Sequence, residues 1–403
     1  MNRSITFWLL MLVFSHCAQA SMSVNQAEDF SELAEFGKAI EGKRIVMLDE
    51  LTHGEQQNFQ LKAKLVRYLH QHHGFSVLLL ESGLYDVEKL WRNDSQALSQ
   101  QAVGNLFYMY ANSSVVQPLL DYIDEQKKGH SPLRLAGFDG RLSGELSRKY
   151  VGAELSQAVQ QLPSQHRQHI DTKKLSVLTQ AIVARDISGY QRAEILDYIN
   201  SAFYLRDVFA AQGAHEDSSG PHYMSRLLEG LAFVAQNLIG ERRHDEHDIV
   251  MANNVKWSLE GPLKGKKVII WGHFVHLNYA GFIGKHYDNL GSLLRQAYGS
   301  ELYHAHIAAA QGEYLDYVSM QVNEITPSTK QIEVKLAQEQ KLSGNEAVFL
   351  SGKELDELAQ RTQRDWVFYS HQYRMSIPVT HWRRYWDGMF VINKTQASDK
   401  AKR

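Results

Sequence analysis

The sequence predicts an α/β fold in which a mostly parallel central sheet is flanked by helices and carries a helical insertion. Four short apolar runs bounded by turn residues have the composition of buried parallel strands. Helical stretches and short loops separate these runs, as is typical of a parallel sheet. From about residue 142 to 260 the sequence shows helical patterns and no convincing strand, which indicates the insertion.

The predicted elements can be placed in order along the chain. A polar lead-in helix at 21–42 precedes the first strand at 44–48, and a helix at 56–73 follows it. Gly74 favours the end of that helix, because glycine readily adopts the left-handed conformation found there. The remaining strands are predicted at 76–80, 133–136, 267–271, 302–308, 347–350 and 389–392, with helices near 85–91, 115–127, 191–212 and 224–239.

The composition is that of a globular protein with a core. Of the 403 residues, 44% are hydrophobic and 22% are charged. The formal net charge of -2 produces no global field that would attract nucleic acid or an anionic membrane, so we expect neither as a partner; the small-molecule substrate expected below rests on the strand-end residues and the family resemblance. One sheet interrupted by a helical domain explains the order of elements better than two tandem domains.

The first twenty residues have the pattern of a secretory signal peptide. Arg3 supplies the positive start, residues 7–14 are apolar, and an Ala-Gln-Ala cleavage motif ends at Ala20. The apolar run is too short to span a bilayer. We therefore expect cleavage after Ala20 and export, most simply to a bacterial periplasm. Cys17, the single cysteine, would be removed, which excludes disulfides, thiolate metal sites and cysteine nucleophiles from the mature chain.

Acidic and histidine side chains stand at the ends of four predicted strands. In an open α/β sheet, ligands bind beyond the carboxyl ends of the strands, so side chains at neighbouring strand ends converge. The sequence therefore predicts one active-site cleft. Its expected members are Glu50, His53, Glu81, Asp139, His273 and His276.

The strongest local signal is the segment 49–54, Asp-Glu-Leu-Thr-His-Gly. Histidine is the natural general base near neutral pH, and the carboxylate of Glu50, three residues before His53, could orient it. Gly54 would permit a sharp turn. Alternatively, the acids only cap the helix that follows, because the N-terminus of a helix favours negative charge.

The other strand-end residues also allow two interpretations. His273 and His276 could ligate a metal ion, or act as base and hydrogen-bond donor. Glu81 follows four apolar residues, where a carboxylate is costly to bury unless it is paired, but it could also have reached solvent. Asp139 lies in a Gly-Phe-Asp-Gly sequence that is ordinary turn composition.

Other polar segments we interpret as structural. The charged segment 244–248 is expected to cap a helix rather than to form a metal cluster, and the histidines at 70, 72 and 73 suit a helix C-terminus. The sequence contains no Gly-x-Ser-x-Gly elbow of the α/β-hydrolases. It also contains no glycine-rich phosphate loop and no His-Glu-x-x-His metalloprotease helix.

These motifs together resemble the erythromycin esterase family. Residues 49–54 stand where the family has a Gly-Glu-x-Thr/Ser-His-Gly turn, and Glu81 stands where it has a strand-end glutamate. Residues 137–139 look like its Gly-x-Asp turn, 251–255 like its Met-Ala-x-Asn helix, and 271–276 like its Trp-Ala-His-Asn-x-His segment. The order and spacing of the motifs make the resemblance specific.

The resemblance runs from about residue 33 to 398 and implies a metal-independent hydrolase without a cofactor. His53 would be the general base that activates water against an ester or lactone carbonyl. Glu50 and Glu81 would orient the site and support it electrostatically. His273 and His276 would position the substrate or stabilise the oxyanion. The implied catalytic residues are His53, Glu50, Glu81 and His273. The implied substrate-binding residues are His276, Asp139 and Asn254.

Three positions depart from the family pattern. Asp49 replaces a glycine and would add a charge and a Cβ at the tight turn. Phe274 replaces the asparagine common between the two histidines, and Gln57 stands near where many members have a glutamate. These last two changes would remove polar groups near the pocket, so we expect a substrate other than a macrolide.

Two alternative functions remain open. The fold is similar to that of the Tiki-type metalloproteases and the ChaN-like haem-binding proteins. In a metal-dependent hydrolase or peptidase of this kind, Glu50, His53, Glu81 and His273 would be metal ligands. A non-catalytic protein would instead use the cleft to bind haem or another ligand.

Overall fold

A computed structural model describes residues 22–23, 29–212, 220–241, 246–281, 287–362 and 365–399. The predicted signal peptide lies outside these residues. Within them, no helix has both the length and the apolar character needed to cross a membrane.

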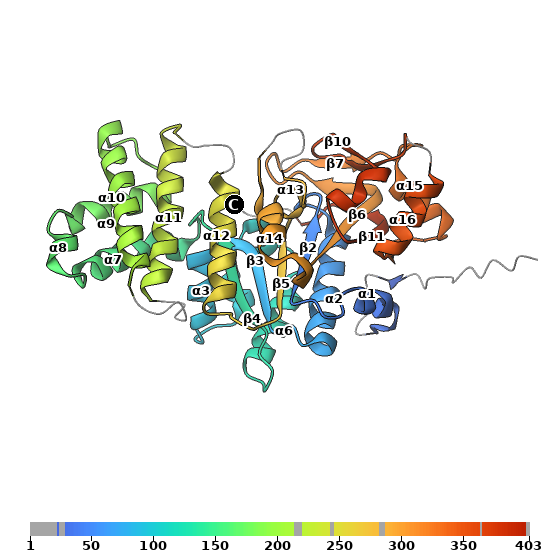
Figure 1. Cartoon of the computed structure of the whole chain (residues 1–403), viewed down its shortest axis with the longest axis horizontal. Coiled ribbons are helices and arrows are strands. Elements are labelled where there is room, and N and C mark those ends of the chain that lie inside the picture. The colour runs from blue at the N-terminus through green and yellow to red at the C-terminus, as the bar shows by residue number, and fades with distance from the viewer. Residues whose placement is uncertain are drawn as a thin grey trace, which may run out of the picture.

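A nine-stranded sheet forms the centre of the molecule, in the order β1-β8-β11-β6-β2-β5-β3-β4 with β7 beside β6 (Figure 1). The strands from β11 to β4 pair in parallel, which confirms the predicted mostly parallel sheet. β9 (Val367–Ser370) and β10 (Met375–Pro378) form a separate pair. The strands of the main sheet are β1 (Met22–Ser23), β2 (Ile45–Glu50), β3 (Val77–Gly83), β4 (Arg134–Asp139), β5 (Val268–His273), β6 (Leu302–Leu315), β7 (Val322–Ile325), β8 (Glu346–Leu350) and β11 (Gly388–Thr395).

Helices cover both faces of the sheet. Phe59 and Leu65 of α2 pack with Leu78 and Leu80 of β3 in one core cluster. The alternate β3 residue Leu79 lies in a second cluster with α12 and α14, because successive side chains of a strand point to opposite faces. The helices outside the insertion are α1 (Ala34–Ala39), α2 (Gln56–His73), α3 (Leu84–Arg92), α4 (Leu98–Ala102), α5 (Tyr108–Ala111), α6 (Gln117–Lys127), α13 (Phe274–Leu277), α14 (Leu290–Tyr298), α15 (Ile332–Glu339) and α16 (Gly352–Arg361).

The segment between β4 and β5 contains only helices and connections in its described residues. Helices α7 to α11 stand to one side of the sheet (Figure 1), and α7, α9, α10 and α11 share an apolar cluster with Leu84 and Tyr85 of α3 and with Val250 and Trp257 of α12. α12 differs, because its residues Met251 and Val255 pack in the sheet core. The helices are α7 (Glu145–Gln160), α8 (Ser164–Arg167), α9 (Thr172–Ala184), α10 (Arg192–Ala210), α11 (Pro221–Leu238) and α12 (Glu246–Glu260).

The predicted bounds of the lead-in helix and of strands β2 and β3 are wrong, and those of the two strands matter for the site. The lead-in helix covers less than 21–42, since its described helical part is the 3-10 turn Ser31–Leu33 and α1. Strands β2 and β3 run further than predicted, to Glu50 and Gly83. Asp49, Glu50 and Glu81 are therefore strand residues and not parts of the turns that follow.

The carboxyl ends of four neighbouring strands bring the site together. α2 spans the predicted residues and ends at Gly74, whose φ of 69° is the left-handed conformation expected there. Glu50 at the end of β2 pairs in register with His273 at the end of β5. β3 and β4 follow in the sheet order, so the carboxyl ends of all four strands meet at one edge.

Candidate active site

The first half of the site is a buried pair formed by Glu50 and His53. Nδ1 of His53 donates to Oε1 of Glu50 at 2.9 Å, and the same oxygen accepts from the hydroxyl of Tyr110 at 2.7 Å. The other oxygen of Glu50 is paired with Lys62. Because a carboxylate only accepts, the proton of the ring lies on Nδ1, and Nε2 keeps its lone pair. Burial lowers the pKa of His53 well below its usual value, so the ring is a neutral base.

Lys62 and Tyr110 were not among the predicted residues. Lys62 lies on the buried face of α2, with Nζ 4.5 Å from the ring centroid of Trp271. Its spacing from Phe59 and Val66 places it on the apolar side of the helix, a signal that the sequence contains. Tyr110 comes from α5, and nothing in the local sequence marks it.

We predict that Lys62 keeps Glu50 ionised and thereby positions His53. Lys62→Met would leave a buried carboxylate without its cation, which typically costs about 3–5 kcal/mol or forces the group to take up a proton. We expect a large loss of kcat/KM that Lys62→Arg partly restores. Equal loss in both variants, or full activity of Lys62→Met, would contradict this role.

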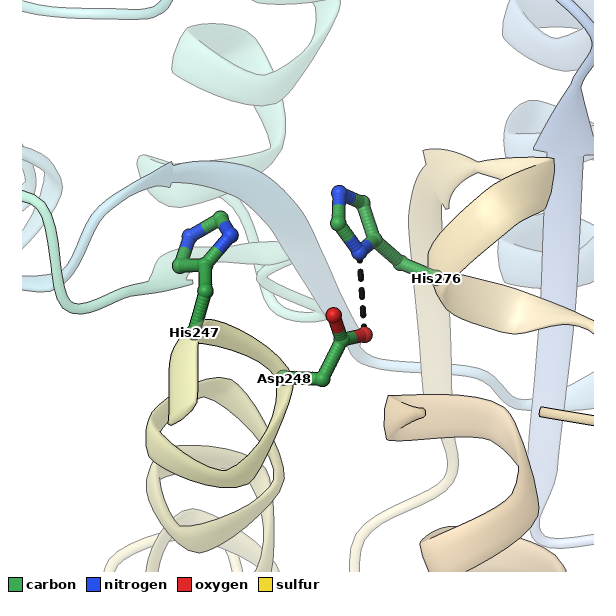
Figure 2. Close-up of side chains that lie close together, drawn as sticks. All are labelled: His247, Asp248 and His276. Carbon is green, nitrogen blue, oxygen red and sulfur yellow. Dashed lines mark hydrogen bonds and ion pairs between the residues drawn. The ribbon is translucent and has the colours of Figure 1, made fainter. Parts of the chain in front are cut away.

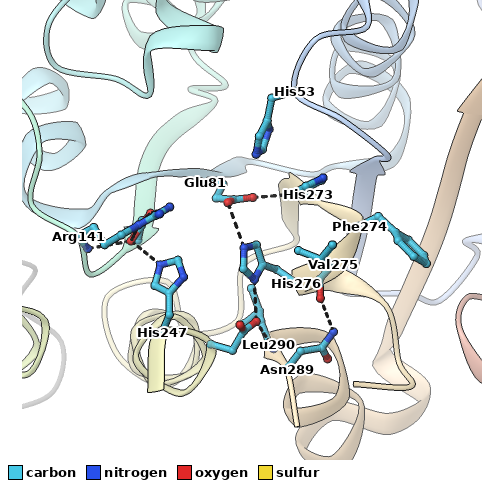
Figure 3. Close-up of polar contacts among 12 residues, drawn as sticks. His53, Glu81, Arg141, His247, His273, Phe274, Val275, His276, Asn289 and Leu290 are labelled. Carbon is cyan, nitrogen blue, oxygen red and sulfur yellow. Dashed lines mark hydrogen bonds and ion pairs between the residues drawn. The ribbon is translucent and has the colours of Figure 1, made fainter. Parts of the chain in front are cut away.

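The second half of the site is formed by Glu81, His273 and His276 (Figure 3). Oε2 of Glu81 accepts from the backbone N–H of His273 at 2.6 Å, and Oε1 lies 3.7 Å from Nε2 of His276. Nδ1 of His276 lies 2.9 Å from Oδ1 of Asp248. Burial opposes the charged ring, but Asp248 and Glu81 raise the pKa of His276 to about 9. His276 is thus a protonated hydrogen-bond donor.

The two histidines that follow β5 differ in protonation. Nε2 of His273 donates to the carbonyl of Leu51 at 3.0 Å, so Nδ1 carries a lone pair. Burial and the charge of His276 lower the pKa of His273 to about 3. Of the two, His276 is therefore the ring able to stabilise negative charge, and His273 is an acceptor.

Asp139 is held by charged neighbours. It accepts from the guanidinium of Arg141, at 2.6 Å to Nη2, and from Nε2 of His247 at 3.0 Å. Burial opposes ionisation, but Arg141 and His247 hold the pKa of Asp139 well below its usual range. The side chain of Arg141 is half exposed, so Asp139 fixes this cation at the rim of the site.

The interpretation of segment 244–248 as capping charge misses two site residues. Residues 244 and 245 lie outside the described part, but His247 and Asp248 begin α12 and reach into the site. Asp248 is buried and accepts from the backbone N–H of Leu290 at 3.0 Å as well as from His276. The sequence held a signal, because His247 lies one helical turn before Met251, on the face that packs on the sheet.

Asn254, a residue of α12, contacts the end of β4. Its amide donates to the carbonyl of Phe138 at 3.0 Å, and the side chain is fully buried. The contact fixes the end of β4 immediately before Asp139. The structure thus gives Asn254 a backbone partner, whereas the resemblance assigned it to substrate binding.

Aromatic rings from three loops surround the histidines. The ring centroid of His53 lies 4.7 Å from that of Phe107 and 4.9 Å from that of Tyr317. The ring of His273 lies 5.3 Å from that of Tyr373, whose exposed fraction is 40%. These rings limit the access of solvent to the two histidines.

The departures from the family pattern have other consequences than expected. Asp49 lies inside β2, where its carboxylate accepts from Nε2 of His304 at 2.7 Å and from Nδ1 of His306 at 2.8 Å. The expectation that Asp49 adds a charge at a tight turn is therefore wrong, because Asp49 is a strand residue. Gly54 is required by close approach, because a Cβ there would lie 1.8 Å from the carbonyl oxygen of Leu315.

The side chains of Phe274 and Gln57 both contact residues other than the site histidines. Phe274 points away from the histidine cluster (Figure 3), and its ring centroid lies 4.9 Å from that of His306. The side chain of Gln57 accepts from the backbone N–H of Gln396 at 2.6 Å. These contacts do not decide the substrate class, so a substrate other than a macrolide stays a prediction.

The metal-ligand set expected in the metal-dependent alternative is not assembled. Glu50 is engaged by Lys62 and Tyr110, and Glu81 by the backbone of His273. Among the described residues, the histidines and carboxylates close enough to share one ion are instead His247, Asp248 and His276.

Comparison with known protein families agrees with this geometry. The family model described as erythromycin esterase matches residues 70–395. The chain belongs to the erythromycin esterase family. The matched segment contains Glu81, Asp139, His273 and His276, while Glu50 and His53 precede it.

Individual relatives support a hydrolase. The chain is 25% identical over 303 residues to YbfO of Bacillus subtilis (strain 168), provisionally named a hydrolase, covering 69% of this chain and 68% of that protein. It is 28% identical over 149 residues to erythromycin esterase type I of Escherichia coli, covering 36% of each. Family membership and these relatives support hydrolase activity but do not identify the substrate.

Solved structures share the fold over nearly the whole chain. A succinoglycan biosynthesis protein has a TM-score of 0.69 at 15% identity and covers 94% of both chains. A Bacillus cereus protein gives 0.67 at 17% identity, covering 94% of this chain and 95% of that one. A mutant of the erythromycin esterase EreC in its open conformation gives 0.65 at 16% identity, with 93% and 95% covered. These likenesses establish the α/β fold.

Proposed function

We propose that this protein hydrolyses a carboxylic ester or lactone by direct attack of water, without a metal ion. The observation that carries the proposal is the buried pair of Glu50 and His53. Its hydrogen bond of 2.9 Å fixes the ring with Nε2 unprotonated, and Tyr110 and Lys62 hold the carboxylate in turn. A histidine oriented in this way is suited to general-base catalysis.

In the proposed reaction, Nε2 of His53 takes a proton from water as the water oxygen attacks the carbonyl carbon. Glu50 stabilises the imidazolium that forms. The carbonyl oxygen becomes negative, and His276 donates a hydrogen bond to it. Collapse of the intermediate breaks the bond to the leaving oxygen, which receives the proton from His53, so that acid and alcohol are released.

The contacts of His276 support its role as the hydrogen-bond donor and that of His53 as the base. Asp248 holds Nδ1 of His276 and directs Nε2 toward Glu81, on the side of the site that faces His53 (Figure 3). Direct attack by water needs no serine or cysteine nucleophile. This agrees with the missing Gly-x-Ser-x-Gly elbow and with a single cysteine at position 17.

The substrate class can be tested with the protein from Ser21 onward. We expect turnover of at least one member of a panel of aryl esters, lactones and macrolides, measured by product formation with a chelator present. A panel of amides and peptides serves as the control class. Cleavage of amides alone, or no turnover of any carbonyl ester, would contradict the proposal.

We further propose that the protein is exported and that its signal peptide is cleaved after Ala20. The basis is the Arg3, apolar run and Ala-Gln-Ala pattern of the first twenty residues. The N-terminal sequence of protein recovered from the periplasm should begin at Ser21. Recovery of the intact N-terminus from the cytoplasmic fraction would contradict export.

A further inference from the structure

We propose that His247, Asp248 and His276 form a binding site for a divalent transition-metal ion, with Zn²⁺ as the best-suited ion. One ligand atom from each of the three side chains lies within 4.8 Å of the other two. Figure 2 shows the two rings on either side of the carboxylate, with a nitrogen of His247 directed toward the other two side chains. The site goes beyond the proposed hydrolysis, which does not use a metal.

Two of the ligand atoms already lie side by side. Nδ1 of His276 and Oδ1 of Asp248 lie 2.9 Å apart. Zinc binds histidine nitrogen and carboxylate oxygen at about 2.0–2.2 Å in tetrahedral geometry, so two such ligands lie about 3.3–3.6 Å apart and this pair would separate by about half an ångström to admit the ion. A zinc ion would replace the proton that Nδ1 of His276 now shares with Asp248. His247 would need only a small movement toward them.

Both histidines also have a carboxylate at their second nitrogen. Nε2 of His247 donates to Asp139 at 3.0 Å, which leaves the lone pair on Nδ1. Nε2 of His276 lies 3.7 Å from Glu81. Histidines that bind metals usually donate their other N–H to a carboxylate or carbonyl, which orients the ring. This outer layer is therefore present for both rings.

A buried oxygen of Asp248 supplies an independent indication. Asp248 is 1% exposed, and its Oδ2 has no hydrogen-bond partner among the described residues. An unpaired buried carboxylate oxygen is costly, because it has lost water without gaining a donor. A cation at this position would compensate for that cost.

The ligand chemistry selects the kind of ion. Two imidazoles and one carboxylate suit zinc and similar transition metals, whereas magnesium and calcium prefer sites built from oxygen atoms. Three protein ligands would leave a fourth position for water. The carboxylates of Asp139 and Glu81 behind the rings offset the positive charge of Arg141.

Calorimetric titration of zinc chloride into the chelator-treated mature protein tests the site. We expect binding at one site, lost in His247→Gln and in Asp248→Asn. The asparagine keeps an oxygen that can accept from the backbone N–H of Leu290, so this variant should fold. His169→Gln, which changes an exposed histidine of the insertion, is the matched control and should bind as the wild type does.

A second measurement uses the outer layer and a spectroscopic signature. Asp139→Asn should weaken zinc binding by about 10–100-fold, the usual effect of losing a carboxylate behind a metal-bound histidine. Co²⁺ should give visible ligand-field bands in the wild type that disappear in His247→Gln. The inference would be overturned if the wild type did not bind zinc, or if His247→Gln and Asp248→Asn bound zinc as tightly as the wild type does.

The outcomes separate this inference from the proposed function. Hydrolysis without metal and no zinc binding would overturn the metal site alone. Zinc binding together with hydrolysis that depends on zinc would support the site and contradict the proposed mechanism.

Discussion

Replacement of His53 by asparagine is expected to lower kcat/KM for ester hydrolysis by about 10²–10⁴-fold, the usual contribution of a general base. The asparagine amide can still donate to Glu50, so the hydrogen bond within the buried pair is kept while the proton acceptor is lost. The melting temperature should change much less than the activity, because the buried hydrogen bond to Glu50 is kept and His53 lies in the turn after β2. Steady-state kinetics on the best substrate of the panel measures the effect.

His70→Asn is the matched control for this change. His70 is also buried, and its ring is hydrogen-bonded to Tyr122 and to the carbonyl of Ser131 at the opposite end of α2. Its replacement tests what the loss of any buried histidine does to the protein. Activity retained by His53→Asn, or an equal loss in His70→Asn, would contradict the role of His53 as the base.

Asp49→Gly, which restores the residue common in the family, is expected to destabilise this protein by about 3–5 kcal/mol, the range found when one partner of a buried ion pair is removed. The carboxylate of Asp49 is fully buried and accepts from His304 and His306. It also accepts a hydrogen bond from the backbone N–H of Ile307 at 2.9 Å. Ile307 lies in β6 beyond Ala305, the last residue of β6 that pairs with β2. Glycine would leave all three groups without this acceptor.

The protonation of His304 explains the size of the effect. Its Nε2 faces Asp49 and its Nδ1 faces the carbonyl of Tyr385 at 3.0 Å. Both partners are acceptors, so the ring satisfies both only when it carries two protons and a positive charge. Burial opposes ionisation of Asp49, but the charges of His306 and His304 hold its pKa well below the usual range.

Urea unfolding of the wild type, Asp49→Gly and Asp49→Asn measures the loss. The asparagine keeps one acceptor and the shape of the side chain, so its effect should be smaller than that of glycine. Because the folded-state pKa of Asp49 is lowered, its contribution is present above the ordinary carboxyl pKa of about 3.9 and is lost as the pH falls below it. Asp49→Gly with wild-type stability would contradict this account.

The sequence predicted the parts of the site that depend on strands. An apolar run followed by an acid or a histidine marks a strand end, and parallel strands present those ends at one edge. Glu50, His53, Glu81 and His273 could therefore be named before the structure was known. The fold class followed from the same strand–helix alternation, and both the fold and the family are confirmed.

The parts that depend on packing between distant segments could not be found in this way. Tyr110 reaches His53 from the short helix α5, and Tyr317 and Tyr373 reach the histidines from loops; none of these segments carries a local motif. His304 and His306 lie in β6 among apolar residues, and only the fold shows that they face Asp49 across the sheet. For this reason the sequence predicts a turn position for Asp49, which lies in β2.

The most direct test of the account is the rate of ester or lactone hydrolysis by the protein from Ser21 onward after any metal ions have been removed. The rate should be measured with a chelator present and again after zinc is added back. Because Nε2 of the buried His53 activates water without a metal, the account predicts full turnover in the stripped protein. Loss of turnover on metal removal, with recovery on addition of zinc, would contradict it.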